Sequence, residues 1–180
     1  MIGSIINKAY KSVITFGILL FSNYVGNDPS FIDTQVEVNN NVIIISSILN
    51  NAFDNDFDDI FSSGIIIDVT FEVEVSHRRS IIIKTQVTNS AVYDFEQNCW
   101  FVRYDESNTV IPIYDIFSLK QAMSILETRI SLNSNYIHSL DISINAKLPV
   151  IHISSIQKDF DLMVLWKQKQ PQERFSINLN

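Results

Sequence analysis

The sequence predicts a mainly β protein on the margin of the α+β class: an antiparallel β-sandwich, or a strongly curved sheet, with one or two helices packed on it. Residues 65–77 alternate apolar and polar side chains, as in a long antiparallel strand with one face in water. Residues 81–96 continue the alternation. The composition, 46% apolar and 18% charged with four glycines and four prolines, is that of a globular chain without long linkers. We therefore expect residues 30–180 to form a single mainly β domain.

The N-terminal residues 1–26 predict a signal peptide or an N-terminal membrane anchor, in the form of a hydrophobic helix. Lys8 and Lys11 precede the apolar run 13–21, which is the order of charge and hydrophobicity in export signals. Neither candidate cleavage site carries the small residue that signal peptidase needs, which favours an anchor that is retained. The alternative is a buried helix of a cytosolic protein. The lysines predict that the domain lies in the periplasm or on the extracytoplasmic face of the inner membrane.

A hairpin and a helix are expected at the start of the domain. Strands over 32–38 and 42–47 flank the turn residues Asn39–Asn41. The acidic stretch 51–63 has helical spacing of its apolar residues, and Gly64 follows as a stop: Phe53, Phe57, Ile60 and Phe61.

The central strands follow. Strand 65–77 places its apolar residues on one face and Asp68, Glu72 and Glu74 on the other. A turn at His77–Ser80 leads into the second long strand, whose apolar face is expected to hold Ile81, Ile83, Val87, Ala91, Tyr93 and Phe95. Shorter strands are predicted near 100–104 and 110–114.

One helix and three strands are expected in the last third of the chain. Ser118 and Gln121 resemble a capping box for a helix over 118–129, with a buried stripe of Leu119, Ala122, Met123 and Leu126. Strand alternation returns over 136–148 and ends at Leu148–Pro149. Further strands are predicted over 162–166 and, as an edge strand, 175–179.

Charge and cysteine content exclude several function classes. The formal net charge is −7, which argues against a nucleic-acid partner because phosphate binding needs clustered Lys and Arg. The dense basic spots are only His77–Arg79 and the pair Lys167 and Lys169, which we interpret as solvated strand ends. The single cysteine, Cys99, is interpreted as a small buried apolar residue.

Candidate metal ligands are sparse, and we expect no metal site and no cofactor. The acidic run 54–59 lacks the glycine and glutamate that an EF-hand loop needs, so a helix start is the better interpretation. His77, His138 and His152 are far apart and show no zinc-like spacing.

No catalytic motif is present, and we expect a protein that is not an enzyme. Glycine motifs for nucleotide binding and the nucleophile elbow are both missing. Asp68, Glu72 and Glu74 share one strand face, which leaves a carboxylate hydrolase as an alternative. That alternative requires a pocket in which Glu72 or Glu74 meets a second carboxylate or a histidine.

The order of these features over residues 43–166 resembles a bacterial family known only as domain of unknown function family 4390. The resemblance rests on segments 58–65, 77–79, 91–94, 116–122 and 140–149. It implies an exported or anchored envelope protein and supplies no activity. The chain departs from the family at Ile81–Ile83, where members have aromatic residues soon after the basic pair.

The sequence thus favours a non-enzymatic domain of the cell envelope that binds another envelope protein through a sheet edge or face. The alternative is a carrier or sensor of an apolar ligand, enclosed by long strands. Its candidate lining residues are Phe71, Tyr93, Trp100 and Phe101.

Overall fold

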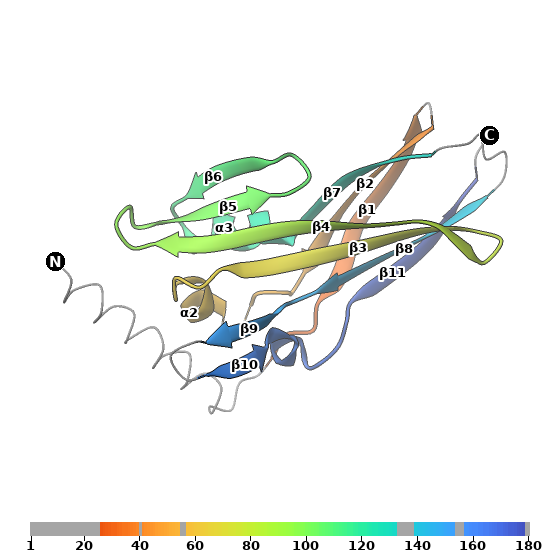
Figure 1. Cartoon of the computed structure of the whole chain (residues 1–180). Helices are drawn as coiled ribbons and strands as arrows, with labels where there is room; N and C mark the ends of the chain where they lie inside the picture. The colour runs from red at the N-terminus through yellow and green to blue at the C-terminus, as the bar shows by residue number, and fades with distance from the viewer. Residues whose placement is uncertain (1–25, 40, 55–56, 133–138, 154–156, 179–180) are drawn as a thin grey trace.

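A computed structural model describes residues 26–39, 41–54, 57–132, 139–153 and 157–178. Within them the chain is mainly β, as the alternation predicts. A six-stranded antiparallel sheet runs in the order β11-β8-β3-β4-β5-β6, and a three-stranded antiparallel sheet runs β1-β2-β7 (Figure 1). A small antiparallel ribbon, β10-β9, and two short helices complete the described part.

In chain order the elements are β1 (Ser30–Asn39), β2 (Val42–Asn50), α2 (Phe57–Phe61), β3 (Ile67–His77), β4 (Ser80–Asp94), β5 (Cys99–Tyr104), β6 (Thr109–Ile113), α3 (Ile116–Ser124), β7 (Ile125–Ser131), β8 (Leu140–Lys147), β9 (Val150–Ile153), β10 (Lys158–Asp161), the 3₁₀ helix η1 (Leu162–Trp166) and β11 (Gln172–Ile177).

The core lies between the two sheets. Every second residue of β3 is fully buried, from Ile67 to Val75, because period-two alternation turns one face of the strand inward. The three-stranded sheet contributes Ile43, Ile45 and Leu49 of β2 to the same cluster. Phe31 of β1 meets Phe71 of β3 with ring centroids 6.3 Å apart, so the sheets contact each other directly. α3 adds to this core and contacts strands of both sheets.

Two contacts join the edges of the sheets. On one side, Thr34 of β1 donates to the carboxylate of Glu173 on β11 at 2.5 Å. On the other side, the turn between β5 and β6 reaches β7, where Glu106 accepts from the backbone N–H of Arg129 at 2.9 Å. The carboxylate therefore satisfies a backbone donor that an edge strand otherwise leaves to water.

The long hairpin β3–β4 confirms the strongest sequence prediction except at Ile81 and at Phe95, which lies beyond the end of β4 and is 39% exposed. Arg78 and Arg79 form its two-residue turn with φ of 48° and 68°, the left-handed geometry of hairpin turns. The register shifts between Val75 and Ser76, so Ile81 is 57% exposed instead of facing the core. The inner face of β4 also holds a polar residue, the buried Asn89.

The helix predicted over 118–129 is too long. α3 ends at Ser124, and β7 begins at Ile125 and pairs with β2. Leu126, Thr128 and Ile130 are buried at every second position, so the strand period prevails there. The cap is also different from the prediction: Asp115, not Ser118, is the N-cap and accepts from the Ser118 N–H at 2.8 Å.

Two further elements differ from the predictions. The helix expected over 51–63 is only α2, and Phe53 is buried outside it. The strand expected over 162–166 is the helix η1, because Leu162, Leu165 and Trp166 bury a face at helical spacing and Asp161 caps the first turn. The edge strand expected at the tail is β11.

Residues 1–25, which carry the predicted export signal or anchor, lie outside the described part of the chain. Within that part, no helix combines the length and the apolar composition that crossing a membrane requires. The described chain enters the domain beside η1, where the N–H of Asn27 donates to the carbonyl of Leu165 at 2.7 Å and Asp28 pairs with Lys169 at 3.0 Å.

Candidate functional site

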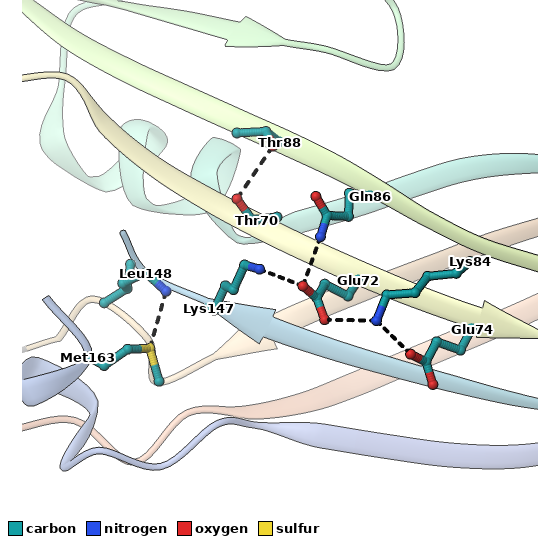
Figure 2. A network of polar contacts seen from close by, with 9 residues as sticks. All are labelled: Thr70, Glu72, Glu74, Lys84, Gln86, Thr88, Lys147, Leu148 and Met163. Carbon is teal, nitrogen blue, oxygen red and sulfur yellow. Dashed lines mark hydrogen bonds and ion pairs between the residues drawn. The ribbon is translucent and has the colours of Figure 1, made fainter. Parts of the chain in front are cut away.

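The outward face of the six-stranded sheet carries a network of paired charges centred on Glu72. Lys147 of β8 approaches the Glu72 carboxylate at 2.5 Å, and Gln86 of β4 donates to it at 2.8 Å (Figure 2). Lys84 lies 2.8 Å from Glu74 and 3.8 Å from Glu72. These side chains come from three neighbouring strands in register, so each charge meets its partner on the sheet.

The lysines of this network favour the ionised form of Glu72. The hydrogen bond from Lys147, with the positive charges of Lys147 and Lys84, holds the pKa of Glu72 below its usual value. A general acid at neutral pH needs the opposite shift. Asp68, on the same face, has one buried carboxylate oxygen without a hydrogen-bond partner among the described residues.

One hollow does bring the carboxylates of Glu74 and Asp141 to the same place, as the hydrolase alternative requires. It has a volume of about 390 Å³ and also holds Arg79 and Arg174. Glu74 is paired with Lys84, and Asp141 accepts from Ser176 at 2.5 Å. Both carboxylates thus already have side-chain partners within the sheet, and neither contacts a second carboxylate or a histidine in the described contacts.

The residues proposed to line an apolar cavity are placed in two different surroundings. Phe71 is fully buried in the core, and the rings of Tyr93 and Trp100 stack with centroids 4.9 Å apart. Trp100 Nε1 donates to the carbonyl of Phe61 at 2.9 Å, which fixes the indole. Phe101 neighbours Trp100 on the strand and therefore faces the other side of the sheet. None of these four residues lines the hollow beside Glu74 and Asp141.

The candidate metal ligands are likewise dispersed. Asp58 of α2 pairs with Lys120 of α3 at 2.5 Å, and His152 pairs with Asp159 across the β9–β10 ribbon at 2.6 Å. His77 Nδ1 lies 3.2 Å from the Ser139 carbonyl, and His138 is outside the described residues. Among the described residues no three potential ligands come together, and Cys99 is a buried thiol.

The outward face of the three-stranded sheet has a different character. Ile32, Ile48 and Ile125 are paired in register across β1, β2 and β7. They are 39%, 40% and 37% exposed, so three branched apolar side chains form one row on the surface. We call this set the isoleucine row. Contiguous apolar surface of this kind is typical of contact sites.

A hollow lies at the α3 end of the isoleucine row. Its volume is about 480 Å³, and Ile48, Ile125 and Phe117 line it together with the loop after β2. Phe117, at the start of α3, is 67% exposed. Ala52 also lines the hollow, and its carbonyl accepts a hydrogen bond from Nε1 of the buried Trp166 at 2.8 Å. The hollow thus lies directly next to the row.

Charged side chains on the outward face of the three-stranded sheet are not paired in the way that the charges around Glu72 are. In the next rows of the sheet, Glu127 lies beside Ser46, and Glu37 and Arg129 lie on either side of Ile44. Glu37, Glu127 and Arg129 are all exposed, and their side chains form no ion pair within the described structure. This face thus combines apolar side chains with unpaired charges of both signs.

Sequence reasoning did not find the isoleucine row. Ile125 was assigned to a helix, and the run 42–50 contains too many consecutive apolar residues for alternation to identify its outward side. The three isoleucines form a row only because β1, β2 and β7 pair in this register, and the sequence does not predict β7 as a strand. Comparisons with protein-family models, curated proteins and solved structures find no match to this chain.

Proposed function

We propose that this chain is an exported or membrane-anchored domain of the bacterial cell envelope that has no enzymatic activity and works by binding another protein. Its place is the periplasm or the extracytoplasmic face of the inner membrane. In this proposal the domain is a β-sandwich held by residues 1–26, and its contact surface is the outward face of the three-stranded sheet.

The observation that carries the proposal is the contrast between the two outward faces. The charges around Glu72 are neutralised by lysines at 2.5–3.8 Å. The opposite face presents the isoleucine row, a hollow and unpaired charges. Burying apolar surface stabilises association by roughly 25 cal/mol per Å², and unpaired charges select the partner. A domain that binds another protein needs both apolar surface for affinity and charges for selectivity.

The proposed location rests on the sequence of residues 1–26 and on the resemblance to exported envelope proteins. Positively charged residues stay on the cytoplasmic side of an export helix, so Lys8 and Lys11 orient the chain with the domain outside. The ordered entry of the chain at Asn27, beside η1, gives the domain a defined point of attachment.

Alkaline phosphatase fused after Asn27 tests this location, because that reporter becomes active only outside the cytoplasm. We expect an active fusion. The control variant Leu19→Arg with Leu20→Arg interrupts the apolar run and should abolish activity by more than tenfold. An inactive parent fusion, with stable protein in the cytosol, contradicts the proposed location.

A further inference from the structure

We propose that the partner bound by the three-stranded face is a second copy of this chain, related by a two-fold axis that runs parallel to β2. The inference deepens the proposed function, since it names the occupant of the same face. It does not depend on where the protein lies in the cell.

The face is built of rows that run across three strands. The first row is the isoleucine row, and the second is Gln35, Ser46 and Glu127. The third row is Glu37, Ile44 and Arg129. Successive rows are two residues apart along β2, about 7 Å, and neighbouring strands are about 4.8 Å apart.

A two-fold rotation about an axis along β2 places β1 of one copy opposite β7 of the other. Each row then faces itself in reverse order. In the third row, Glu37 faces Arg129 of the second copy, and the same pair forms again on the other side of the axis. Ile44 and Ile48 each face their own counterpart, and Ile32 faces Ile125. In the second row Glu127 faces the neutral Gln35, so no like charges face each other, and Glu37, Arg129 and the isoleucine row are matched in a single arrangement.

The other two-fold axis in the plane of the sheet fits less well. An axis perpendicular to the strands, between the second and third rows, pairs Glu127 with Arg129, but it places Ile44 opposite Ser46 and leaves Glu37 opposite the neutral Gln35. It also moves the isoleucine row about 20 Å from its counterpart, at three row spacings of about 7 Å. The first arrangement alone pairs Glu37 with Arg129 and brings Ile48 to its counterpart.

Another exposed apolar surface, on β6, is less suited to an added strand. Val110 and Ile111 are 55% and 38% exposed, but Pro112 removes a backbone donor from this edge. Proline on an edge strand opposes pairing with another chain. Contact between sheet faces, as in aligned sheet packing, needs no free backbone groups.

Sedimentation of the full chain in mild detergent tests the pairing by charge exchange. We expect a monomer–dimer equilibrium for the unaltered chain at concentrations up to ~0.1 mM. Glu37→Arg alone and Arg129→Glu alone each create two like-charge contacts and should raise the dimer Kd about tenfold or more. The double variant Glu37→Arg/Arg129→Glu restores opposite charges and should return the Kd to within about threefold of the original.

A cysteine variant tests the position of the axis. Ile48→Cys should give a covalent dimer with a short bismaleimide, since Cys99 is buried and the two introduced thiols face each other. Ile66→Cys is the matched control because Ile66 is an apolar residue, 59% exposed, away from this face. It should give no cross-link above background.

Three outcomes overturn the inference: a chain that stays monomeric at all concentrations, a double charge variant as weak as the single variants, or equal cross-linking from positions 48 and 66. A strictly monomeric chain with an active phosphatase fusion removes the dimer and leaves the proposed location intact. An inactive fusion, together with a dimer that responds to charge exchange, removes the proposed location and leaves the dimer intact.

Discussion

Asn89 illustrates how a single polar residue organises the core. Its side-chain amide is buried on the inner face of β4 and donates to the carbonyl of Ile125 at 2.7 Å. Ile125 is the point at which the chain passes from α3 into β7. A carbonyl at a helix end has no partner within the helix, so Asn89 satisfies it and fixes the position of the transition.

Replacement of Asn89 by Ala should lower the free energy of unfolding by about 2 kcal/mol, because a buried carbonyl loses its donor. Urea denaturation followed by fluorescence measures the change. Gln86→Ala is the matched control: it removes an exposed amide that bonds to Glu72 and should cost no more than about 0.5 kcal/mol. Equal losses for the two variants would rule out this role for Asn89.

Arg78 and Arg79 are unusual residues for the turn that they form. Both have positive φ. Residues other than glycine, asparagine and aspartate adopt this backbone conformation only at a cost in free energy. Arg78→Asn combined with Arg79→Gly should therefore raise the free energy of unfolding by about 1 kcal/mol. The thermal unfolding midpoint reports the change, with Arg78→Lys as the neutral control. A lower midpoint for the Asn–Gly variant would show that the arginines contribute contacts that outweigh the backbone strain.

At the scale of elements, the strands whose apolar residues keep a period of two along their whole length were predictable from the sequence. β3 and β4 alternate over long stretches with one wet face, so their pairing and turn follow from the sequence. α3 and β7 were not separable in this way, because Leu126 satisfies the helical spacing from Leu119 and the strand spacing to Ile130. Only the pairing of β7 with β2 selects the strand, and long-range pairing is invisible to a local pattern.

The candidate site shows the same limit of a local sequence pattern. Glu72 and Glu74 were identified as neighbours on one face from β3 alone, and that placement is confirmed. Their lysine partners could not be assigned without the register of β4 and β8. The isoleucine row requires two registers at once, and one of its strands was expected to be helical.

Glu106 protects the edge of β7. Its carboxylate accepts from the Arg129 N–H at 2.9 Å and from the Thr128 hydroxyl at 3.3 Å. Glu106→Ala should destabilise the protein by about 1 kcal/mol and speed hydrogen exchange at the Arg129 amide. Asp105→Ala is the control, since the Asp105 side chain pairs with the exposed Arg103 and the substitution keeps the backbone hydrogen bonds of Asp105. Unchanged exchange at Arg129 in the Glu106 variant would show that this contact does not protect the edge.

For the whole molecule, the paired carboxylates determine the response to acid. The pKa of Glu72 is lowered in the folded state by the hydrogen bond from Lys147, and that of Asp115 by the backbone N–H of Ser118. A lowered folded pKa contributes stability above the unfolded value, 4.5 for Glu72, and the contribution is lost as the pH falls through the folded pKa.

The stability difference between the unaltered chain and Glu72→Gln should therefore be positive at pH 7 and shrink below about pH 4.5. Chemical denaturation at pH 7, 5 and 3 measures it. Glu96→Gln provides the comparison, because Glu96 is exposed and its side chain forms no ion pair in the described part of the chain. A difference between Glu72→Gln and the unaltered chain that does not vary with pH would contradict this assignment.

The two outward faces differ in a way that also concerns the whole molecule. The six-stranded sheet satisfies its own charges around Glu72. The three-stranded sheet leaves an apolar row and charges of both signs exposed. This contrast is the basis on which we propose the three-stranded sheet as the contact surface.

The most direct test of this account places a photo-crosslinking amino acid on each face in living cells. At position 48, in the isoleucine row, we expect covalent adducts with protein in the envelope fraction after illumination. At position 86, on the six-stranded sheet beside Glu72, we expect the unmodified chain alone. Adducts at position 86 with none at position 48 would contradict the assignment of the contact face, and the account would then have to be abandoned.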